Sequence, residues 1–155
     1  NGNQEIALML LKVEGIDVNK ADGDGQTPLW AAAGHQEIVS MLLKVEGIDV
    51  NQADKDGRTP LHRAVSGLGP RPEQQEIVSM LLKVEGIDVN QADGDGRTPL
   101  WRAAWDSKQE IVSMLLKVDG IDVNQADKNG RTPLFIAGEE GHKEIVSMLK
   151  KSGGI

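Results

Sequence analysis

Apolar residues recur with helical spacing in a short segment that appears five times along the chain. In the second copy, Ile38, Leu42 and Val45 fall at positions i, i+4 and i+7, which is the spacing of an amphipathic helix with a broad apolar face. The copies lie at Gln4–Val13, Gln36–Val45, Gln75–Val84, Gln109–Val118 and Lys143–Lys151. Each helix carries more apolar surface than it can bury alone, so the pattern predicts helices that pack against one another in series.

A second pattern links these helices. Gly-Ile-Asp-Val-Asn alternates apolar and polar residues like a short extended segment, and it is followed by Asp-x-x-Gly. In the copy at Asp54, the carboxylate can bond to the following backbone amides, and Gly57 can take a positive φ, so this stretch predicts a turn. Thr59 is a good N-cap and Pro60 suits the first position of a helix. We therefore expect a short first helix over Pro60–Val65, followed by a loop and the longer helix.

The turn and the start of the first helix form one eleven-residue signature. Its copies are Asp22–Ala32, Asp54–Ala64, Asp93–Ala103 and Asp127–Ala137. Self-similarity at this period is typical of solenoids. The shared Gly-x-Thr-Pro-Leu-x-x-Ala resembles the ankyrin repeat, over nearly the whole chain. The resemblance implies an all-α repeat solenoid of helix-turn-helix units with short β-hairpin loops. It also implies a non-catalytic role in protein–protein interaction, with the partner bound on the concave face formed by the hairpin tips and first helices.

The signature divides the chain into a half unit and four full units, which together form one domain. They are 1–18, 19–50, 51–89, 90–123 and 124–155. The turn glycines Gly57 and Gly96 are further apart than the others, because residues 66–75 carry an insertion. Its glycines and prolines predict a loop, and we expect Ser66–Gln74 to be the most mobile internal segment.

The two ends of the repeat pattern differ. Nothing precedes the first helix to cover Ile6 and Leu10, which predicts a piece of a longer array and self-association through this uncapped N-terminal end. The extra lysines near Lys151 suit a helix C-terminus and favour a better-capped C-terminal end. The high similarity between units fits a consensus-designed protein or a recent tandem duplication, and the uneven spacing favours a natural origin.

Composition narrows the function. The net charge of −7 argues against a general nucleic-acid or anionic-membrane binder, which needs a basic surface. No apolar run is long enough to span a bilayer. The absence of cysteine excludes disulfides and suits a reducing compartment, so we expect a cytoplasmic or nuclear protein.

No recognisable chemical site emerges from the motifs. The Asp-x-Asp-Gly turns at Asp22 and Asp93 lack the Gly and Glu spacing of a calcium loop. The three histidines have no nucleophile arranged beside them, and the family resemblance implies that His62 ties the first helix to its loop. We therefore expect no catalysis, cofactor or metal. The resemblance also implies that asparagines such as Asn51, in Asp-Val-Asn, can be hydroxylated, although a structural hydrogen bond explains their presence better.

Residues that do not repeat are the best candidates for partner recognition, because repeating residues are already needed for the fold. Trp and Arg are the residues most enriched at interface hot spots. The candidates are Arg58, Arg63, Arg97, Trp101, Arg102, Trp105, Arg131 and Phe135. Trp30, Trp101 and Phe135 replace the histidine that is usual in the family, so we expect them to lose its hydrogen bond and to pack in the core. Trp105 could be either a contact residue or a packing residue, and without such a non-repeating patch the chain would be a structural spacer.

Overall fold

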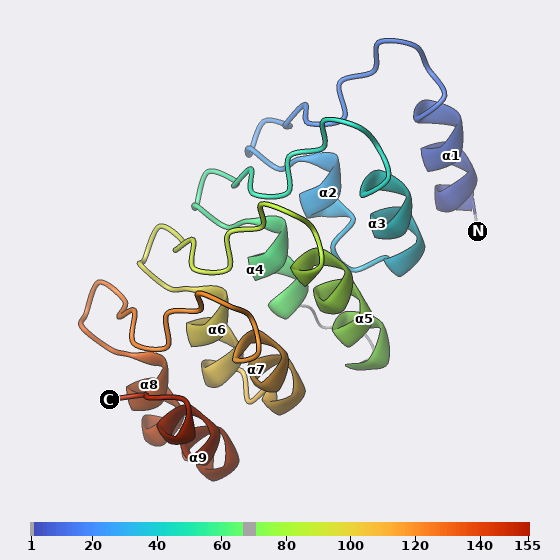
Figure 1. Ribbon diagram of the computed structural model, residues 1–155. Coiled ribbons are helices and arrows are strands. Elements are labelled where there is room, and N and C mark those ends of the chain that lie inside the picture. The colour runs from blue at the N-terminus through green and yellow to red at the C-terminus, as the bar shows by residue number, and fades with distance from the viewer. Residues whose placement is uncertain (1, 67–70) are drawn as a thin grey trace.

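The computed structural model describes residues 2–66 and 71–155, and these contain nine helices and no strand. The helices are α1 (Gly2–Leu10), α2 (Pro28–Ala31), α3 (Gln36–Leu42), α4 (Pro60–Val65), α5 (Arg71–Leu82), α6 (Pro99–Trp105), α7 (Gln109–Leu115), α8 (Pro133–Glu139) and α9 (Lys143–Lys151). Figure 1 shows two rows of helices, with α2, α4, α6 and α8 in one and α1, α3, α5, α7 and α9 in the other. The loops project from the side of the first row, and the two termini lie at opposite ends.

The helices stack in the order of the sequence. Within the described residues, each pair of helices in substantial contact belongs either to one unit or to neighbouring units, such as α4 with α6 or α5 with α7. This arrangement confirms the all-α repeat solenoid and its stacking in sequence order.

Each first helix begins with the same local device. In α4, Thr59 has an extended backbone and its hydroxyl oxygen accepts from the backbone N–H of His62, while Pro60 occupies the first helical position. Thr27, Thr98 and Thr132 do the same in α2, α6 and α8. An N-cap of this kind is worth about 1 kcal/mol, so the helix starts follow directly from the Thr-Pro sequence.

The turns before these helices are closed by an aspartate and stacked on one another. Oδ1 of Asp54 accepts from the backbone N–H groups of Asp56 at 3.0 Å and Arg58 at 2.8 Å. The backbone N–H of Asp54 donates to the carbonyl of Arg58 at 3.0 Å, and the N–H of Gly94 in the next turn donates to the carbonyl of Asp56. The hairpin loops expected from the sequence are therefore hydrogen-bonded turns, without strands in the part of the chain that the structure describes.

The insertion is not a loop throughout. Helix α5 begins at Arg71, so the expectation of a loop over 66–75 is wrong for residues 71–75, while residues 67–70 lie outside the described part. Pro72 is tolerated because it falls in the first turn of the helix. The buried amide of Gln74 donates to the carbonyls of Ala64 and Val65 at 2.8 and 2.7 Å, which ties the start of α5 to the end of α4.

The core lies between the two rows of helices. It is mainly aliphatic, as expected, with residues such as Leu61, Val78 and Leu100 fully buried. Asparagines outside the core tie the start of each full unit to its end. The side chain of Asn51 donates to the carbonyl of Gly86 at 2.7 Å and accepts from the N–H of Asp88 at 2.9 Å. Asn19, Asn90 and Asn124 make equivalent pairs of bonds, which confirms the structural role predicted for these residues.

Candidate protein-binding surface

Five arginines lie on the turns and first helices and define what we call the arginine surface. Arg58, Arg97 and Arg131 occupy the same position after the turn glycine, whereas Arg63 and Arg102 occupy equivalent positions in α4 and α6. They include every arginine whose side chain the structure describes. The arginines whose side chains the structure describes thus share one part of the repeat, and the tryptophans lie in the same part.

The arginines stack on tryptophan rings in two groups. Around Trp30, the guanidinium carbons of Arg58 and Arg63 lie 5.8 and 5.4 Å from the ring centroid. Around the Trp101 and Trp105 pair, the corresponding distances to the nearest ring are 5.1 Å for Arg97, 4.7 Å for Arg102 and 5.5 Å for Arg131. Cation–π contacts at exposed sites are worth about 0.5–1 kcal/mol each. Their main effect here is to hold flexible side chains in place.

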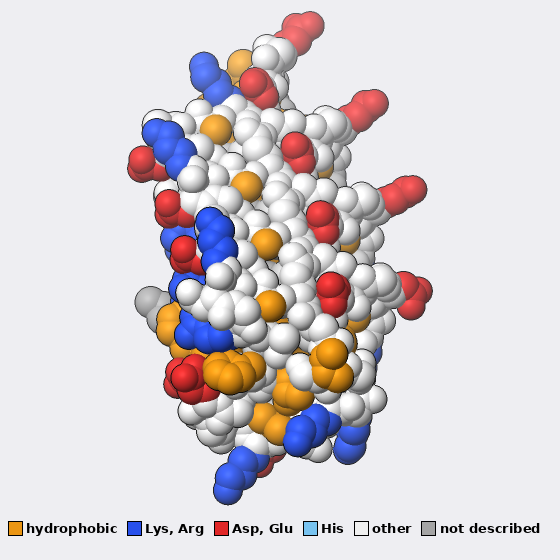
Figure 2. Space-filling view, turned by 90° about the vertical axis from the view of Figure 1, so that its left-hand side faces the viewer, with side chains coloured by type: hydrophobic (Ala, Val, Ile, Leu, Met, Phe, Trp, Pro, Cys, Tyr) orange, Lys and Arg blue, Asp and Glu red, His pale blue; other side chains and the backbone are white. Residues whose placement is uncertain are grey.

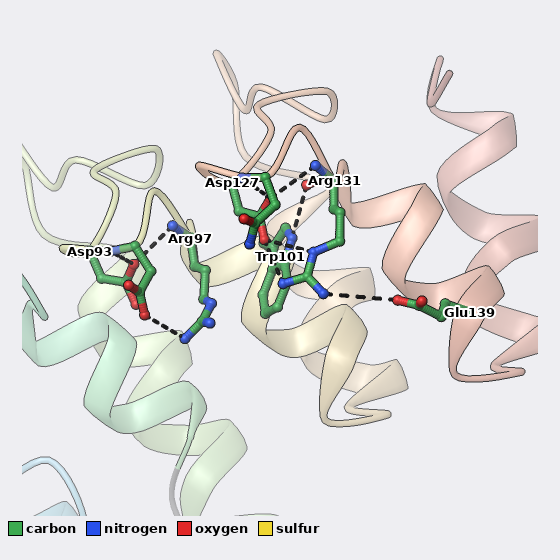
Figure 3. Close-up of polar contacts among 8 residues, drawn as sticks. Asp93, Arg97, Trp101, Asp127, Arg131 and Glu139 are labelled. Atoms are coloured by element: carbon green, nitrogen blue, oxygen red, sulfur yellow. Dashed lines mark hydrogen bonds and ion pairs between the residues drawn. The ribbon is translucent and has the colours of Figure 1, made fainter.

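Four of the five arginines also form ion pairs within the chain. Arg58 contacts Asp54 at 2.8 Å and Asp56 at 2.7 Å. The remaining pairs are Arg97 with Asp95, Arg102 with Asp106, and Arg131 with Asp127, each at 2.8 Å, together with a longer contact of 4.0 Å from Arg131 to Glu139. Figure 3 shows the Arg131 side chain beside Trp101, reaching towards Glu139. No carboxylate pairs with Arg63 among the residues that the structure describes.

The ion pair between Arg131 and Asp127 involves a buried carboxylate. Burial acts to raise the pKa of Asp127, but hydrogen bonds from Arg131 and Asn129 outweigh this effect and hold the pKa below its usual value. The carboxylate therefore stays ionised and keeps Arg131 in position. The hydrogen bond from Arg58 to Asp54 likewise raises the pKa of the Arg58 guanidinium.

Trp101 supports the surface from below and does not form part of it. Only 1% of this residue is exposed, so its inclusion among the contact residues is wrong. Its indole N–H donates to the carbonyl of Arg131 at 3.0 Å (Figure 3). His62 makes the same contact to the next unit, where Nε2 lies 2.9 Å from the carbonyl of Arg97. The prediction that Trp101 loses the hydrogen bond made by the usual histidine is therefore wrong. For Trp30 the prediction is confirmed, because its buried indole nitrogen has no hydrogen-bond partner among the described residues.

Phe135 lies at the same position of the last unit but is 54% exposed. The expectation that it packs in the core is wrong, because the structure holds no further unit for the ring to pack against. Phe135 and Leu134 border a pocket of about 480 Å³ that also involves Val146 and Lys150. The lysines of α9 leave some apolar surface exposed at this end, although fewer large apolar side chains are exposed here than on α1.

Trp105 has the packing role considered for it. It is half-buried and packs on the core, and its ring meets that of Trp101 edge to face with centroids 5.5 Å apart. Its backbone carbonyl is 3.0 Å from Nε2 of His142 in the next unit. The outer part of the ring carries Arg102, so Trp105 links the core to the arginine surface.

A polar groove runs between the second and third turns. It has a volume of about 450 Å³, and its lining combines four cations with three carboxylates: Lys55, Asp56, Arg58, Asp93, Gly94, Asp95, Arg97 and Arg102. Sequence reasoning missed Asp106, although the i, i+4 spacing of Arg102 and Asp106 is a recognisable signal for a helical ion pair. The groove offers donors and acceptors side by side, as a polypeptide partner requires.

The chain belongs to the ankyrin-repeat family. A family model described as ankyrin repeats (3 copies) matches residues 1–93 and again residues 71–155. Ankyrin repeats generally mediate protein–protein interaction and are typically non-catalytic. A search of curated proteins finds none that matches the chain. Within the described residues, no helix has the length and apolar character needed to cross a membrane.

Proposed function

We propose that the chain is a non-catalytic module that binds a partner protein on the concave face implied by its family. The observation that carries the proposal is the arginine surface, where side chains that are not shared by all four full units gather around Arg63, Arg97, Arg102 and Trp105. A structural spacer, the alternative function, needs only the repeating residues. Tryptophan and arginine held in fixed positions favour binding, because little conformational entropy is lost when a partner docks.

A photocrosslinking experiment tests the location of the partner. A benzophenone amino acid is placed at Lys55, which lines the polar groove, and in a matched protein at Lys83, which is exposed just after α5 of the same unit. In a native lysate, we expect a protein adduct from position 55 and none from position 83. Equal adducts from both positions would place the binding surface elsewhere.

The identified partner then allows an affinity measurement. Trp105→Ala should weaken binding by about 2 kcal/mol, or roughly thirtyfold, if this ring is a hot spot. Circular dichroism must confirm folding, because Trp105 also packs on the core. Unchanged affinity for both Trp105→Ala and Arg102→Ala, in folded protein, would exclude the arginine surface as the binding site.

A second proposal concerns self-association through α1. Ile6, Met9 and Leu10 are largely exposed on this helix, and exposed apolar faces of solenoids tend to associate. Sedimentation velocity over a range of protein concentrations should show an increasing average mass that Leu10→Gln reduces. A constant monomer mass would exclude this contact.

A further inference from the structure

Arg63 differs from the other arginines of the surface because its chain supplies no counter-ion. Arg102, at the same position of the next unit, pairs with Asp106 four residues later at 2.8 Å. The residue four positions after Arg63 is Gly67, so the counterpart of Asp106 is missing from the sequence. Among the described residues, Arg63 is consequently the arginine left with an exposed and uncompensated charge.

The guanidinium of Arg63 is nevertheless held in place. Its central carbon lies 5.4 Å from the centroid of the Trp30 ring, and this ring is fixed in the core with only 8% of the residue exposed. Cation–π contact needs no hydrogen-bond acceptor, so the N–H groups of the guanidinium keep their capacity to donate. A planar fork of donors matches the two oxygens of a carboxylate.

The charges on the rest of the molecule favour an acidic ligand at this place. Exposed carboxylates follow α1, α3, α5 and α7, at Glu14, Glu46, Glu85 and Asp119 and again at Asp17, Asp49, Asp88 and Asp122. Figure 2 shows acidic side chains repeating along one side of this face, whereas the opposite edge carries basic side chains interspersed with acidic ones. A chain with net charge −7 repels acidic partners over most of its surface. The arginine surface is where such a partner can approach.

We propose that the partner presents an acidic peptide segment whose carboxylate binds Arg63 through two hydrogen bonds. This inference rests on the proposed function and names its ligand chemistry. The other four arginines keep their internal ion pairs and contribute stacking and shape. Arg63 is therefore the specificity-determining residue of the surface.

A displayed library of random dodecapeptides, panned against the intact chain, tests this assignment. We expect enrichment of Asp and Glu in the bound peptides. For a synthetic copy of the most enriched peptide, Arg63→Gln should weaken binding by about tenfold or more, as for other close charge pairs. Lys83→Gln removes one positive charge just after α5, in the same unit as Arg63. It should change the affinity by less than roughly twofold, because salt screens exposed charges at a distance.

Two further changes, one in the peptide and one in the chain, test whether the charge of the peptide carboxylate accounts for the binding. Replacing the critical Glu of the peptide by Gln should cost as much as Arg63→Gln, and the two changes together should cost no more than either alone, because they remove one shared interaction. Asp106→Asn releases Arg102 from its ion pair, so this variant should bind the acidic peptide more tightly than the parent chain.

The outcomes distinguish this inference from the proposed function. Enriched peptides without carboxylates, or equal effects of Arg63→Gln and Lys83→Gln, would overturn the acidic ligand while leaving the arginine surface as a binding site. Binding that is insensitive to Arg63→Gln, Arg102→Ala and Trp105→Ala alike would reject the surface as well. If no peptide is enriched, the acidic-segment inference fails, and the crosslinking experiment still decides whether a protein binds there.

Discussion

His62 connects the start of α4 to the next unit through one buried imidazole ring. Nδ1 accepts from the backbone N–H of Thr59 at 3.2 Å, and Nε2 lies 2.9 Å from the carbonyl of Arg97 in the next unit. An acceptor at Nδ1 and a donor at Nε2 define the neutral ring. Burial lowers the pKa of His62, and this effect outweighs the opposing contributions from the Arg97 carbonyl and from Asp93. The folded state therefore favours the uncharged form.

The lowered pKa predicts acid sensitivity. The unfolded ring titrates near pH 6.5, so the stabilising contribution is complete above this pH and falls as the pH drops from there towards the lower pKa of the folded state. Urea denaturation at pH 7.5 and pH 5 should show a larger loss of unfolding free energy for the parent chain than for His62→Gln. Equal losses in both proteins would mean that other groups cause the acid sensitivity.

Trp101 and Trp30 offer a comparison at the same position of two units. The indole N–H of Trp101 donates to Arg131, whereas that of Trp30 has no partner among the described residues. Substitution by phenylalanine removes the indole N–H at either position and reduces the size of the aromatic ring by the same amount. Trp101→Phe should therefore be less stable than Trp30→Phe by about 1 kcal/mol, the net worth of a hydrogen bond. Thermal or urea denaturation of the two variants measures this difference, and equal stability would show that the indole bond contributes nothing.

At the scale of the elements, each of the first three turns depends on a glycine for two separate reasons. Gly57 has a φ of +77°, and a Cβ added there would lie 2.7 Å from the backbone nitrogen of Gly94 in the next turn. Gly86 has a similar φ of +81°, but a Cβ would meet nothing within 4 Å. A comparison of the two glycines therefore distinguishes the cost of backbone strain from the cost of a clash between neighbouring turns.

Alanine at these two glycines should give different losses of stability. Gly86→Ala should cost about 1–2 kcal/mol, the strain of a left-handed non-glycine residue. Gly57→Ala should cost more, because it also forces two stacked turns apart. The free energies of unfolding from urea denaturation check the order, and a Gly57→Ala loss no larger than that of Gly86→Ala would show that the turns separate freely.

Elements determined by local sequence could be predicted, and those determined by distant partners could not. The Thr-Pro helix starts and the Asp-x-x-Gly turns depend on residues within a few positions of one another. The helical start of α5 depends on Gln74 reaching carbonyls at the end of α4. The buried position of Trp101 depends on a carbonyl thirty positions away, at Arg131. The arginines of the candidate site were predictable, and their ion pairs join residues close in the sequence, as with Arg102 and Asp106. Their stacking was not predictable, because it brings together residues of different units, as with Arg131 and Trp101.

At the scale of the whole molecule, the helices in substantial contact belong to the same or to neighbouring units, in the part of the chain that the structure describes. The stability of such a chain is approximately the sum of the stabilities of its units and of the interfaces between neighbours. A helix at one end has a neighbour on one side only, whereas an internal helix has neighbours on both. Equivalent residues should therefore contribute unequally according to their place in the stack.

Leu10 and Leu81 allow a direct measurement of this inequality, because they occupy the same position of α1 and α5. Leu10 is 51% exposed, whereas Leu81 is completely buried. Leu81→Ala should cost about 2–5 kcal/mol, because it removes buried methyl groups and leaves a cavity between three helices. Leu10→Ala should cost less than about 1 kcal/mol, because much of the side chain is already in water. Urea denaturation measures both values, and hydrogen exchange should show weak amide protection in α1 and strong protection in α5. Equal losses for the two variants would mean that α1 is buried in solution, as it would be in the self-associated form proposed for this chain.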